Sequence, residues 1–527
     1  MSTKRKDVAK AYITYRQERT KIREANGTYV KNIEKKLNVE NNTRQNANVD
    51  EESFGGRMGE ASGANLKEYA LNYCMPKWME DLHRNNEIYI HDLDHYALGD
   101  HNCLSIPFDK LLANGFNTRQ TDVRPANSVN TAFQLVAVIF QLQSLNQFGG
   151  VSATHLDWTM VPYVRKSFHK HFRDGIFYVE QIILDCNPPE GIDIKDLAID
   201  SDFYKDLNCP KAYQYAIDMT EREIYQAVEG MYHNLNTLQS RSGNQLPFTS
   251  INYGTCTLPE GRMIIKALLD VSIEGIGALH KTSIFPCGIF QCMKGVNRKP
   301  GDPNYDLFKL ALKSTAQRLY PNYANVDWTG NEGYDRNDPK TYFSTMGCRT
   351  ANGFDINGMG QTKDGRGNIC PVTIILPTIA MEAKISSDKW ISKNEQLNGE
   401  WVGIHSELYI KHFMNLLDEK IHQAKDMLIE RFNYICSQSP ASAKFMWENG
   451  TMEGYIPEEG IRSALCHGTL ALGQLGLAEC LQILIGKDHT TTEGMELAKR
   501  IEQLFKDRCA EFKQKYKLNF GVYYTPA

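Results

Sequence analysis

The stretch Thr341-Tyr-Phe-Ser-Thr-Met-Gly-Cys-Arg-Thr350 decides how the rest of the chain is interpreted. It runs from an apolar and aromatic lead-in to Gly347, and then to Cys348 and a cation. Glycine lets the backbone bend where other residues resist, so we expect a tight loop tip that presents the Cys348 thiol into a cavity. On this decapeptide alone, the alternative is that Cys348 is a small core hydrophobe, as most free cysteines are.

The composition is that of a globular chain. It has 527 residues, of which 42% are hydrophobic, enough for one very large domain or several ordinary ones. The net charge of −4 and the pI near 6.4 argue against binding to a nucleic-acid polymer or a membrane surface. No window approaches the roughly eighteen consecutive apolar residues of a membrane-spanning helix, and the charged N-terminus lacks a signal peptide's apolar run.

The thirteen cysteines are scattered and form no CxxC pair. This pattern fits neither the usual zinc knuckle nor a secreted disulfide framework, so we expect a reducing, cytoplasmic compartment. The run from His91 to Cys103 is dense in histidine and acidic side chains, and a metal site there is an alternative. Because that run shows no clean ligand spacing, we expect no metal in this chain.

Hydrophobic periodicity predicts helices alternating with strands through most of the chain. Leu66 to Asn85 reads as a helix interrupted at Pro76, and Ile404 to Ile435 as a long amphipathic helix. The polar passage Asn38 to Gly63 predicts an extended arm or loop. Buried-strand content is seen at Glu87–Leu93, Thr282–Gln291 and Arg366–Leu376. This alternation without a clear linker predicts one large α/β barrel-like domain.

Many short stretches, each weak alone, run in order from about residue 45 to the last residue. They are Asn46–Asp50, Arg57-Met58, Ser62-Gly63, Tyr69–Tyr73, Ile88–Tyr96, His101-Asn-Cys103, Gln147-Phe-Gly-Gly150, Gln245–Asn252, Lys294–Asn297, Met346-Gly-Cys-Arg349, Arg366-Gly-Asn368, His467–Leu470, Gly476–Glu479 and Tyr523-Tyr-Thr-Pro-Ala527. Taken together and in this order, they resemble the anaerobic (class III) ribonucleoside-triphosphate reductases.

The resemblance implies a ten-stranded α/β barrel of the ribonucleotide reductase and glycyl radical enzyme type, with a finger loop through its centre. It implies that Cys348, at the loop tip, becomes a thiyl radical and abstracts the ribose 3′-hydrogen. Cys103 then supplies hydrogen as the 2′-hydroxyl leaves as water, and Asn368 hydrogen-bonds the ribose. An ordinary cysteine is only about 3% thiolate at neutral pH, so most of it carries the hydrogen that such transfer needs.

The resemblance also implies residues that contact the substrate. His101 and Asn102 stand beside Cys103, and Thr350 matches a polar residue two positions beyond the radical cysteine. A turn at Thr525, Pro526 and Ala527 matches the one that cradles the substrate phosphates with backbone N–H groups.

The sequence departs from the family at both ends. Residues 1–45 predict a helical extension that is too short for an ATP-binding cone, and residues 46–527 match the catalytic barrel. The family continues past Thr-Pro-Ala with a four-cysteine zinc site and an Arg-x-x-Gly-Tyr segment that stores the radical. We therefore expect a C-terminally truncated barrel, with no cofactor or metal site of its own, that needs a separate C-terminal glycyl-radical fragment holding the zinc.

The expected partners follow from the same resemblance. They are an iron–sulfur, radical-SAM activating enzyme that uses S-adenosylmethionine, ribonucleotide substrates, and allosteric ATP and dNTP effectors. We expect a homodimer in the cytoplasm of a bacterium, or encoded by a phage in a bacterial host, that serves deoxyribonucleotide biosynthesis for DNA replication.

Two choices stay open on the residues. An asparagine at Asn368 goes with formate as the reductant, whereas relatives with a cysteine there resemble enzymes that use a thioredoxin-like donor. Cys370 complicates this choice, because in a regular strand residues i and i+2 share a face and Cys370 could pair with Cys103. We expect formate.

Two other readings compete with an active reductase. The first is a catalytically inactive scaffold that binds nucleotide effectors or dimerises, its chemistry lost with the missing segment. The second is a glycyl radical enzyme of the formate-lyase type. The intact Cys103, Cys348 and Asn368 favour the reductase over the scaffold, and the His-Asn-Cys stretch argues against the formate-lyase type.

Overall fold

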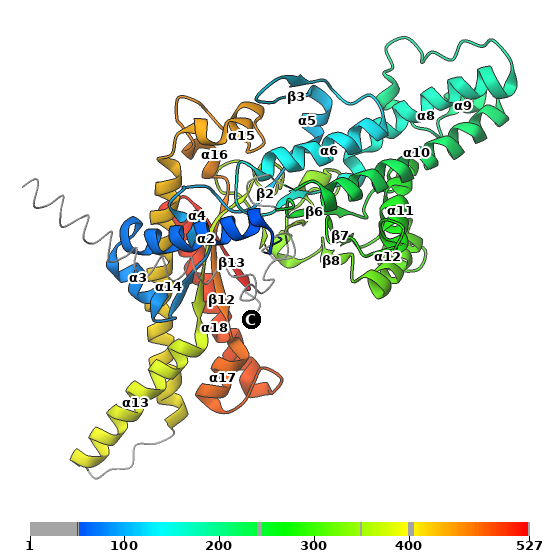
Figure 1. Ribbon diagram of the computed structural model, residues 1–527. Helices are drawn as coiled ribbons and strands as arrows, with labels where there is room; N and C mark the ends of the chain where they lie inside the picture. The colour runs from blue at the N-terminus through cyan, green and yellow to red at the C-terminus, as the bar shows by residue number, and fades with distance from the viewer. Residues whose placement is uncertain (1–49, 51, 240–244, 348–349, 399–404, 525–527) are drawn as a thin grey trace, which may run out of the picture. The chain divides into compact units, whose positions relative to one another are not determined.

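The computed structural model describes residues 50, 52–239, 245–347, 350–398 and 405–524 (Figure 1). The predicted N-terminal extension of residues 1–45 lies outside the described residues. The chain divides into two compact units. The smaller unit comprises Met1–Arg84, Asp92–Gly99 and Gln239–Leu246, and the larger one comprises Asn85–His91, Asp100–Leu238 and Pro247–Ala527.

The smaller unit is helical where it is described. Its elements are α2 (Phe54–Tyr69), the π-helix η2 (Ala70–Cys74), α3 (Lys77–Arg84) and α4 (Leu93–Tyr96). The predicted break at Pro76 is confirmed, but the extended arm predicted up to Gly63 is wrong from Phe54 onward. Ser53 caps α2, since its Oγ accepts the Gly56 N–H at 3.0 Å and satisfies one of the free donors of the first turn.

The larger unit contains a five-stranded parallel sheet. Its strands, in spatial order, are β2 (Leu104–Ser105), β5 (Val151–Ala153), β6 (Thr249–Tyr253), β7 (Cys287–Cys292) and β8 (Asn322–Asn325). Parallel neighbours need crossover connections, and helices supply them. The crossover helices include α8 (Val161–Gly175), α10 (Pro210–Thr237), α11 (Pro259–Glu274) and α12 (Tyr305–Arg318). Figure 1 shows α8 and α10 side by side.

A second sheet in the same unit has four strands. They are β1 (Ile88–Ile90), β11 (Asn368–Ile375), β12 (Thr469–Leu475) and β13 (Asn519–Tyr524), with β1 antiparallel to β11 and the other pairs parallel. The helices α13 (Leu376–Asn398), α14 (His405–Cys436), α17 (Leu477–Ile485) and α18 (Thr492–Tyr516) connect the parallel strands. The amphipathic helix predicted from Ile404 to Ile435 is confirmed as α14.

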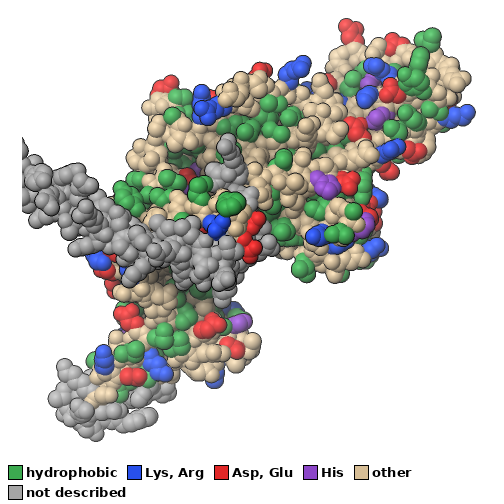
Figure 2. Space-filling view, viewed as in Figure 1, with side chains coloured by type: hydrophobic (Ala, Val, Ile, Leu, Met, Phe, Trp, Pro, Cys, Tyr) green, Lys and Arg blue, Asp and Glu red, His purple; other side chains and the backbone are tan. Residues whose placement is uncertain are grey.

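The two sheets meet where Leu104 forms an antiparallel bridge with Gly367. The predicted α/β class is therefore confirmed. The strand pairing of the described residues shows these two larger sheets and two two-stranded ones, and does not show closure into a ten-stranded barrel. No described helix is long and apolar enough to cross a membrane. Among the described residues on the face seen in Figure 2, Lys and Arg side chains are scattered between acidic and apolar ones.

Three polar side chains join the strands of the second sheet. Tyr523 Oη lies 2.8 Å from Thr373 Oγ1 and 2.9 Å from His91 Nε2, and His91 Nε2 lies 2.7 Å from Thr373 Oγ1. Gly473 of β12 lies in register between Thr373 and Tyr523. A Cβ on Gly473 would stand 2.5 Å from Thr373 Oγ1 and 2.7 Å from the Tyr523 ring, so the network requires glycine at this position.

This geometry predicts a cost for any side chain at Gly473. We expect Gly473→Ala to lower the free energy of unfolding by about 1–3 kcal/mol, because the added carbon overpacks the contact between Thr373 and Tyr523. Gly230, inside helix α10, is the matched control, since a Cβ there meets nothing within 4 Å. Gly230→Ala should raise the stability by about 0.5–1 kcal/mol. Urea unfolding followed by circular dichroism measures both, and an unchanged Gly473→Ala midpoint would contradict the packing argument.

Candidate active site

A short hairpin lies against the five-stranded sheet. Its arms are β9 (Thr345–Met346) and β10 (Thr350–Ala351), and the Thr350 hydroxyl donates a hydrogen bond to the Met346 carbonyl at 2.9 Å. Gly347 turns the chain with a φ of 60°, a left-handed conformation that favours glycine. Cys348 and Arg349 lie outside the described residues, and the hairpin formed by β9, Gly347 and β10 is here called the finger.

Buried polar side chains of the sheet hold the backbone of the finger. Asn252 of β6 accepts the Thr345 N–H at 3.1 Å and donates to the Thr345 carbonyl at 3.1 Å. Ser152 of β5 donates to the same carbonyl at 3.0 Å. The Gly347 N–H donates to Ser250 Oγ at 3.1 Å, one step nearer the tip. These bonds satisfy backbone groups that would otherwise be buried without partners.

The sequence did not predict roles for these residues. The available signal was the alternation of polar and apolar residues at Ser250-Ile-Asn252, because strands buried on both faces normally read as continuous apolar runs. Gln291 of β7 has the same role at the base of the finger, where it donates to the Phe343 carbonyl at 3.0 Å. Polar side chains on consecutive buried strands therefore mark the face along which the finger lies.

The predicted residue Cys103 lies opposite the predicted residue Asn368. The Asn368 N–H donates to the Cys103 carbonyl at 2.9 Å, one residue away from the bridge between Leu104 and Gly367. Opposite residues of antiparallel partners place their side chains on the same face, with Cα atoms about 4.5–5.5 Å apart. The Cys103 thiol is buried and donates a hydrogen bond to Asn102 Oδ1 at 2.8 Å.

Gly150 connects this pair to the finger. Its carbonyl accepts the Leu104 N–H at 3.0 Å, next to Cys103 in the chain. A Cβ built on Gly150 would lie 3.4 Å from the Cα of Gly347, which shows how closely the finger passes. The structure therefore brings three separate sequence motifs, those of Cys103, Gly150 and Asn368, to the described end of the finger.

The side chain of Asn368 has unused hydrogen-bonding capacity. It is only 1% exposed, and neither its Oδ1 nor its Nδ2 has a hydrogen-bond partner among the described residues. A buried amide without partners costs free energy, so a ligand that supplied a donor and an acceptor would offset that cost. Two adjacent hydroxyl groups are one chemical match, since each hydroxyl can both donate and accept.

Cys370 points away from this place. The register of β11 on β12 shifts between Asn368, opposite Thr469, and Cys370, opposite Leu470. Thr469 and Leu470 are consecutive, so their side chains lie on opposite faces, and those of Asn368 and Cys370 do so too. The regular alternation considered from the sequence is therefore absent, because a bulge intervenes. The Cys370 thiol instead contacts the Leu428 carbonyl of α14 at 3.7 Å.

The other predicted site residues lie as follows. His101 is 2% exposed with its Nε2 3.0 Å from Met446 Sδ, and burial lowers the pKa of this histidine to about 4. Asn102 is partly exposed next to Cys103, and Gln147 donates to the Asn102 carbonyl at 2.8 Å. Thr525, Pro526 and Ala527 lie outside the described residues. Within the described ranges, no three His, Cys, Asp or Glu side chains group as a metal site would require.

The chain that returns from the finger to β11 is held by an ion pair. His467 Nδ1 lies 2.8 Å from Asp355 Oδ2, and Asp355 Oδ1 accepts from Asn519 Nδ2 at 2.7 Å. The hydrogen bond to Asp355 raises the pKa of His467 to about 9. Burial opposes the charge of Asp355, but its hydrogen bonds with His467 and Asn519 keep its pKa below the usual range. The pair is therefore charged at neutral pH.

Comparisons with known proteins agree on one family. A family profile described as "Anaerobic ribonucleoside-triphosphate reductase" matches residues 45–527. The chain is 27% identical over 544 residues to the anaerobic ribonucleoside-triphosphate reductase of Haemophilus influenzae, covering 100% of this chain and 67% of that protein. The enzyme of the same name from Enterobacteria phage T4 is 28% identical over 488 residues, covering 92% and 70%. The chain thus spans about two thirds of the length of these relatives.

A solved structure shares the fold. The anaerobic ribonucleotide reductase from Thermotoga maritima in complex with dATP and CTP superimposes with a TM-score of 0.55 at 15% identity. The superposition covers 89% of this chain and 67% of that chain.

The ion pair of His467 predicts a pH dependence of stability. A histidine whose pKa rises on folding from about 6.5 stabilises the protein below that pH and loses this effect as the pH passes through its folded value. We expect His467→Gln to remove up to about 3 kcal/mol of the stability that the native chain loses between about pH 7 and pH 10. His233→Gln, at a half-exposed histidine of α10, is the control and should follow the native profile. The prediction would be contradicted if the free energy of unfolding changed with pH in the same way in the native chain and in both variants.

Proposed function

The chain belongs to the anaerobic ribonucleoside-triphosphate reductase family, and we propose that it reduces ribonucleoside triphosphates to 2′-deoxyribonucleoside triphosphates for DNA synthesis. One observation carries the proposal. Cys103 and Asn368 lie opposite each other on the same face, beside a glycine-turned finger whose next residue is Cys348. A hydrogen-donating thiol and an amide with free donor and acceptor atoms are the two groups that a ribose needs at its 2′ and 3′ positions.

Each residue has one step in this proposal. A glycyl radical supplies the oxidising equivalent that converts the Cys348 thiol to a thiyl radical. The thiyl takes the hydrogen atom from C3′ of the ribose, and Asn368 holds the hydroxyl groups. The 2′-hydroxyl leaves as water after gaining a proton, and Cys103 gives its hydrogen atom to C2′. Because the 3′-hydroxyl loses its proton as water leaves, this transfer produces a 3′-ketone and a Cys103 thiyl radical. The external reductant supplies two electrons which, with two protons, restore the Cys103 thiol and convert the ketone to a C3′ radical. Cys348 then returns its hydrogen atom to C3′, and its thiyl radical forms again.

The radical itself comes from outside these 527 residues. No Arg-x-x-Gly-Tyr segment occurs in them, and the Gly-Tyr pairs Gly333-Tyr334 and Gly454-Tyr455 lie in other surroundings. The proposed supplier is a glycyl-radical segment with a zinc site, charged by a radical-SAM activating enzyme that consumes S-adenosylmethionine. The relatives come from bacteria and a bacteriophage, which supports the proposed localisation in a bacterial cytoplasm.

Nucleotides also serve as regulators in this proposal. The Thermotoga maritima protein was solved in complex with dATP and CTP, and another of its structures carries dATP in the specificity site. By analogy, ATP and dNTP effectors select the substrate of this chain, which acts as a homodimer. An inactive scaffold would bind effectors without turnover, so an assay of both properties distinguishes the scaffold from an active reductase.

The test is to assemble this chain with a glycyl-radical segment and its activating enzyme, and to follow 3′-tritiated substrate. The assembled wild type should form dNTP. We expect Cys348→Ser to lose both tritium release and dNTP formation, since no thiyl can form. Cys103→Ser should still release tritium from C3′ but form no dNTP, because only the second hydrogen donor is gone. The free energy of unfolding should change by less than roughly 2 kcal/mol in either variant. Normal turnover by Cys348→Ser would overturn the proposal, and a wild type that binds effectors without turnover favours the scaffold.

We propose formate as the reductant. Formate gives up two electrons and a proton as carbon dioxide, and these electrons with two protons convert the nucleotide to product and water. A thiol donor would instead need a disulfide partner for Cys103, and Cys370 is held on the opposite face by α14. This placement supports formate.

Labelled formate decides between the two reductants. We expect labelled carbon dioxide in a one-to-one ratio with dNTP, and the same ratio in Cys370→Ser, because that thiol takes no part. Cys480→Ser, at another fully buried thiol, controls for the loss of a packed sulfur. Turnover that ignores formate and requires a dithiol together with Cys370 would exclude the formate route.

A further inference from the structure

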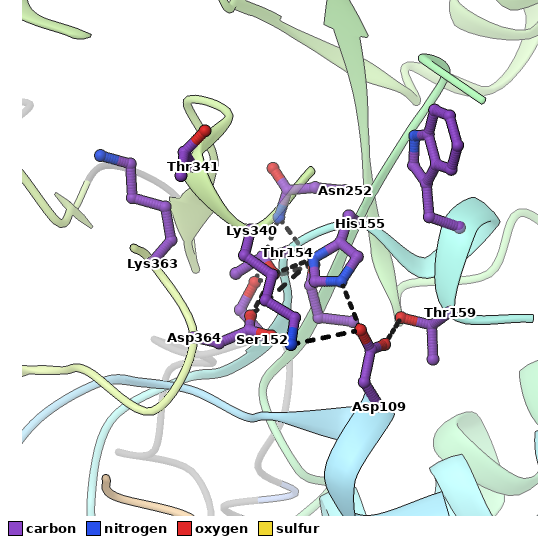
Figure 3. A network of polar contacts seen from close by, with 12 residues as sticks. Asp109, Ser152, Thr154, His155, Thr159, Asn252, Lys340, Thr341, Lys363 and Asp364 are labelled. Carbon is purple, nitrogen blue, oxygen red and sulfur yellow. Dashed lines mark hydrogen bonds and ion pairs between the residues drawn. The ribbon is translucent and has the colours of Figure 1, made fainter. Parts of the chain in front are cut away.

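A chain of charged groups lies at the base of the finger (Figure 3). His155, which follows β5, has its Nε2 3.2 Å from Asp109 Oδ2 and its Nδ1 3.9 Å from Asp364 Oδ1. Lys340 Nζ lies 3.8 Å from the same oxygen of Asp109. Thr154 bridges the inner part, since its hydroxyl donates to Asp364 and lies 2.6 Å from His155 Nδ1. These groups come from four separate segments of the chain.

The hydrogen-bond directions indicate a charged imidazole. The Thr154 hydroxyl has one hydrogen and donates it to Asp364, so towards His155 Nδ1 it can only accept. His155 Nε2 faces a carboxylate of Asp109 that already accepts from Thr159 at 2.5 Å. Both ring nitrogens therefore carry hydrogens, which makes His155 a cation between two carboxylates.

The charges of the group balance. Asp109 and Asp364 oppose His155 and Lys340, and the nearby Asp157 is satisfied separately by three backbone N–H groups at 2.9–3.0 Å. Burial works against the imidazolium, but the two carboxylates outweigh it and raise the pKa of His155 to about 9. Burial also raises the pKa of Asp364 to about 6.

The group includes residues from both flanks of the finger, which are the segments that precede its first arm and follow its second arm. Lys340 precedes the arm that begins at Thr345, and Asp364 follows the other arm and leads into Asn368. The two flanks are also joined directly, because the Lys363 N–H donates to the Lys340 carbonyl at 2.8 Å. His155 directly follows β5 of the five-stranded sheet, and Asp109 lies on α5 (Phe108–Asn114), so the group joins both flanks of the finger to these two elements.

We propose that Asp109, His155, Asp364 and Lys340 are positioning residues that clamp the base of the finger and so set where Gly347, the last described residue of its first arm, lies against Gly150. This inference rests on the proposed reductase function for its catalytic meaning, but not for its structural test. Buried charges are stable only when each has its partner, and removal of one leaves the other uncompensated. Loss of the His155 cation would leave two carboxylates facing each other, and the flanks would separate.

Hydrogen exchange of the finger tests the clamp without any turnover. In His155→Gln, the amides of Thr345 and Gly347 should exchange at least about tenfold faster than in the native chain, because the base of the finger opens locally. The matched control is His171→Gln, at another buried histidine–carboxylate pair in which Nε2 lies 2.7 Å from Glu223 Oε2. That pair joins α8 to α10 and should leave the finger amides unchanged.

Two further variants distinguish a charge clamp from general packing. The double variant His155→Gln with Asp364→Asn removes one charge of each sign, so its finger should exchange more slowly than that of His155→Gln alone. Lys340→Met, at a side chain that is 45% exposed, carries little risk of misfolding and should speed finger exchange about threefold. Lys340→Met alone decides the question if the His155 variants do not fold.

The outcomes separate this inference from the proposed function. Unchanged finger exchange in His155→Gln or Lys340→Met would overturn the clamp, as would an equal rise across the whole chain without recovery in the double variant. In the assembled reductase, Lys340→Met should lower kcat with little change in KM. If the finger amides exchange faster in these variants but the assembled wild type forms no dNTP, the clamp is upheld and the proposed reductase function is rejected.

Discussion

The two-way hydrogen bond between the Asn252 side chain and the backbone of Thr345 is the contact on which the site depends. A hairpin that lies against a buried sheet face cannot use strand pairing to satisfy all of its own N–H and C=O groups. The sheet must therefore provide side-chain partners, and Asn252, Ser152, Ser250 and Gln291 do so. Their spacing along three parallel strands fixes how far the finger extends along the sheet face as well as its direction.

The proposed chemistry depends on where the finger is held. Hydrogen-atom transfer acts only over short distances, so the proposed radical site and hydrogen donor, which lie on different segments, need a common rigid support. The support here is the ladder of backbone hydrogen bonds that joins the Cys103 segment to Gly150 on one side and to Asn368 on the other. Cys103 and Asn368 thus share a face next to Gly150, which lies close to Gly347 of the finger.

Buried charged groups lie on both sides of the described part of the finger. The group of Asp109, His155, Asp364 and Lys340 lies at its base, and the pair of Asp355 and His467 holds the chain that follows it. Between these groups, Thr345 and Gly347 of the finger bond to neutral amides and hydroxyls of the sheet. Neutral partners hold this segment without placing a charge beside the proposed radical site, while the charged groups anchor its flanks.

The sequence alone determined the α/β class and the helix at Ile404–Ile435, because local hydrophobic periodicity specifies both. It also contains the short stretches around Cys103, Cys348 and Asn368, whose catalytic roles stay predictions. It did not determine that Cys370 faces α14, since the bulge beside Asn368 exists only through pairing with β12. Nor could it join His155 to Asp109 and Asp364, because residues so distant along the chain meet only through the packing of β5, α5 and the finger flank. Local patterns specify elements and candidate groups, while strand register and burial decide which groups share a face.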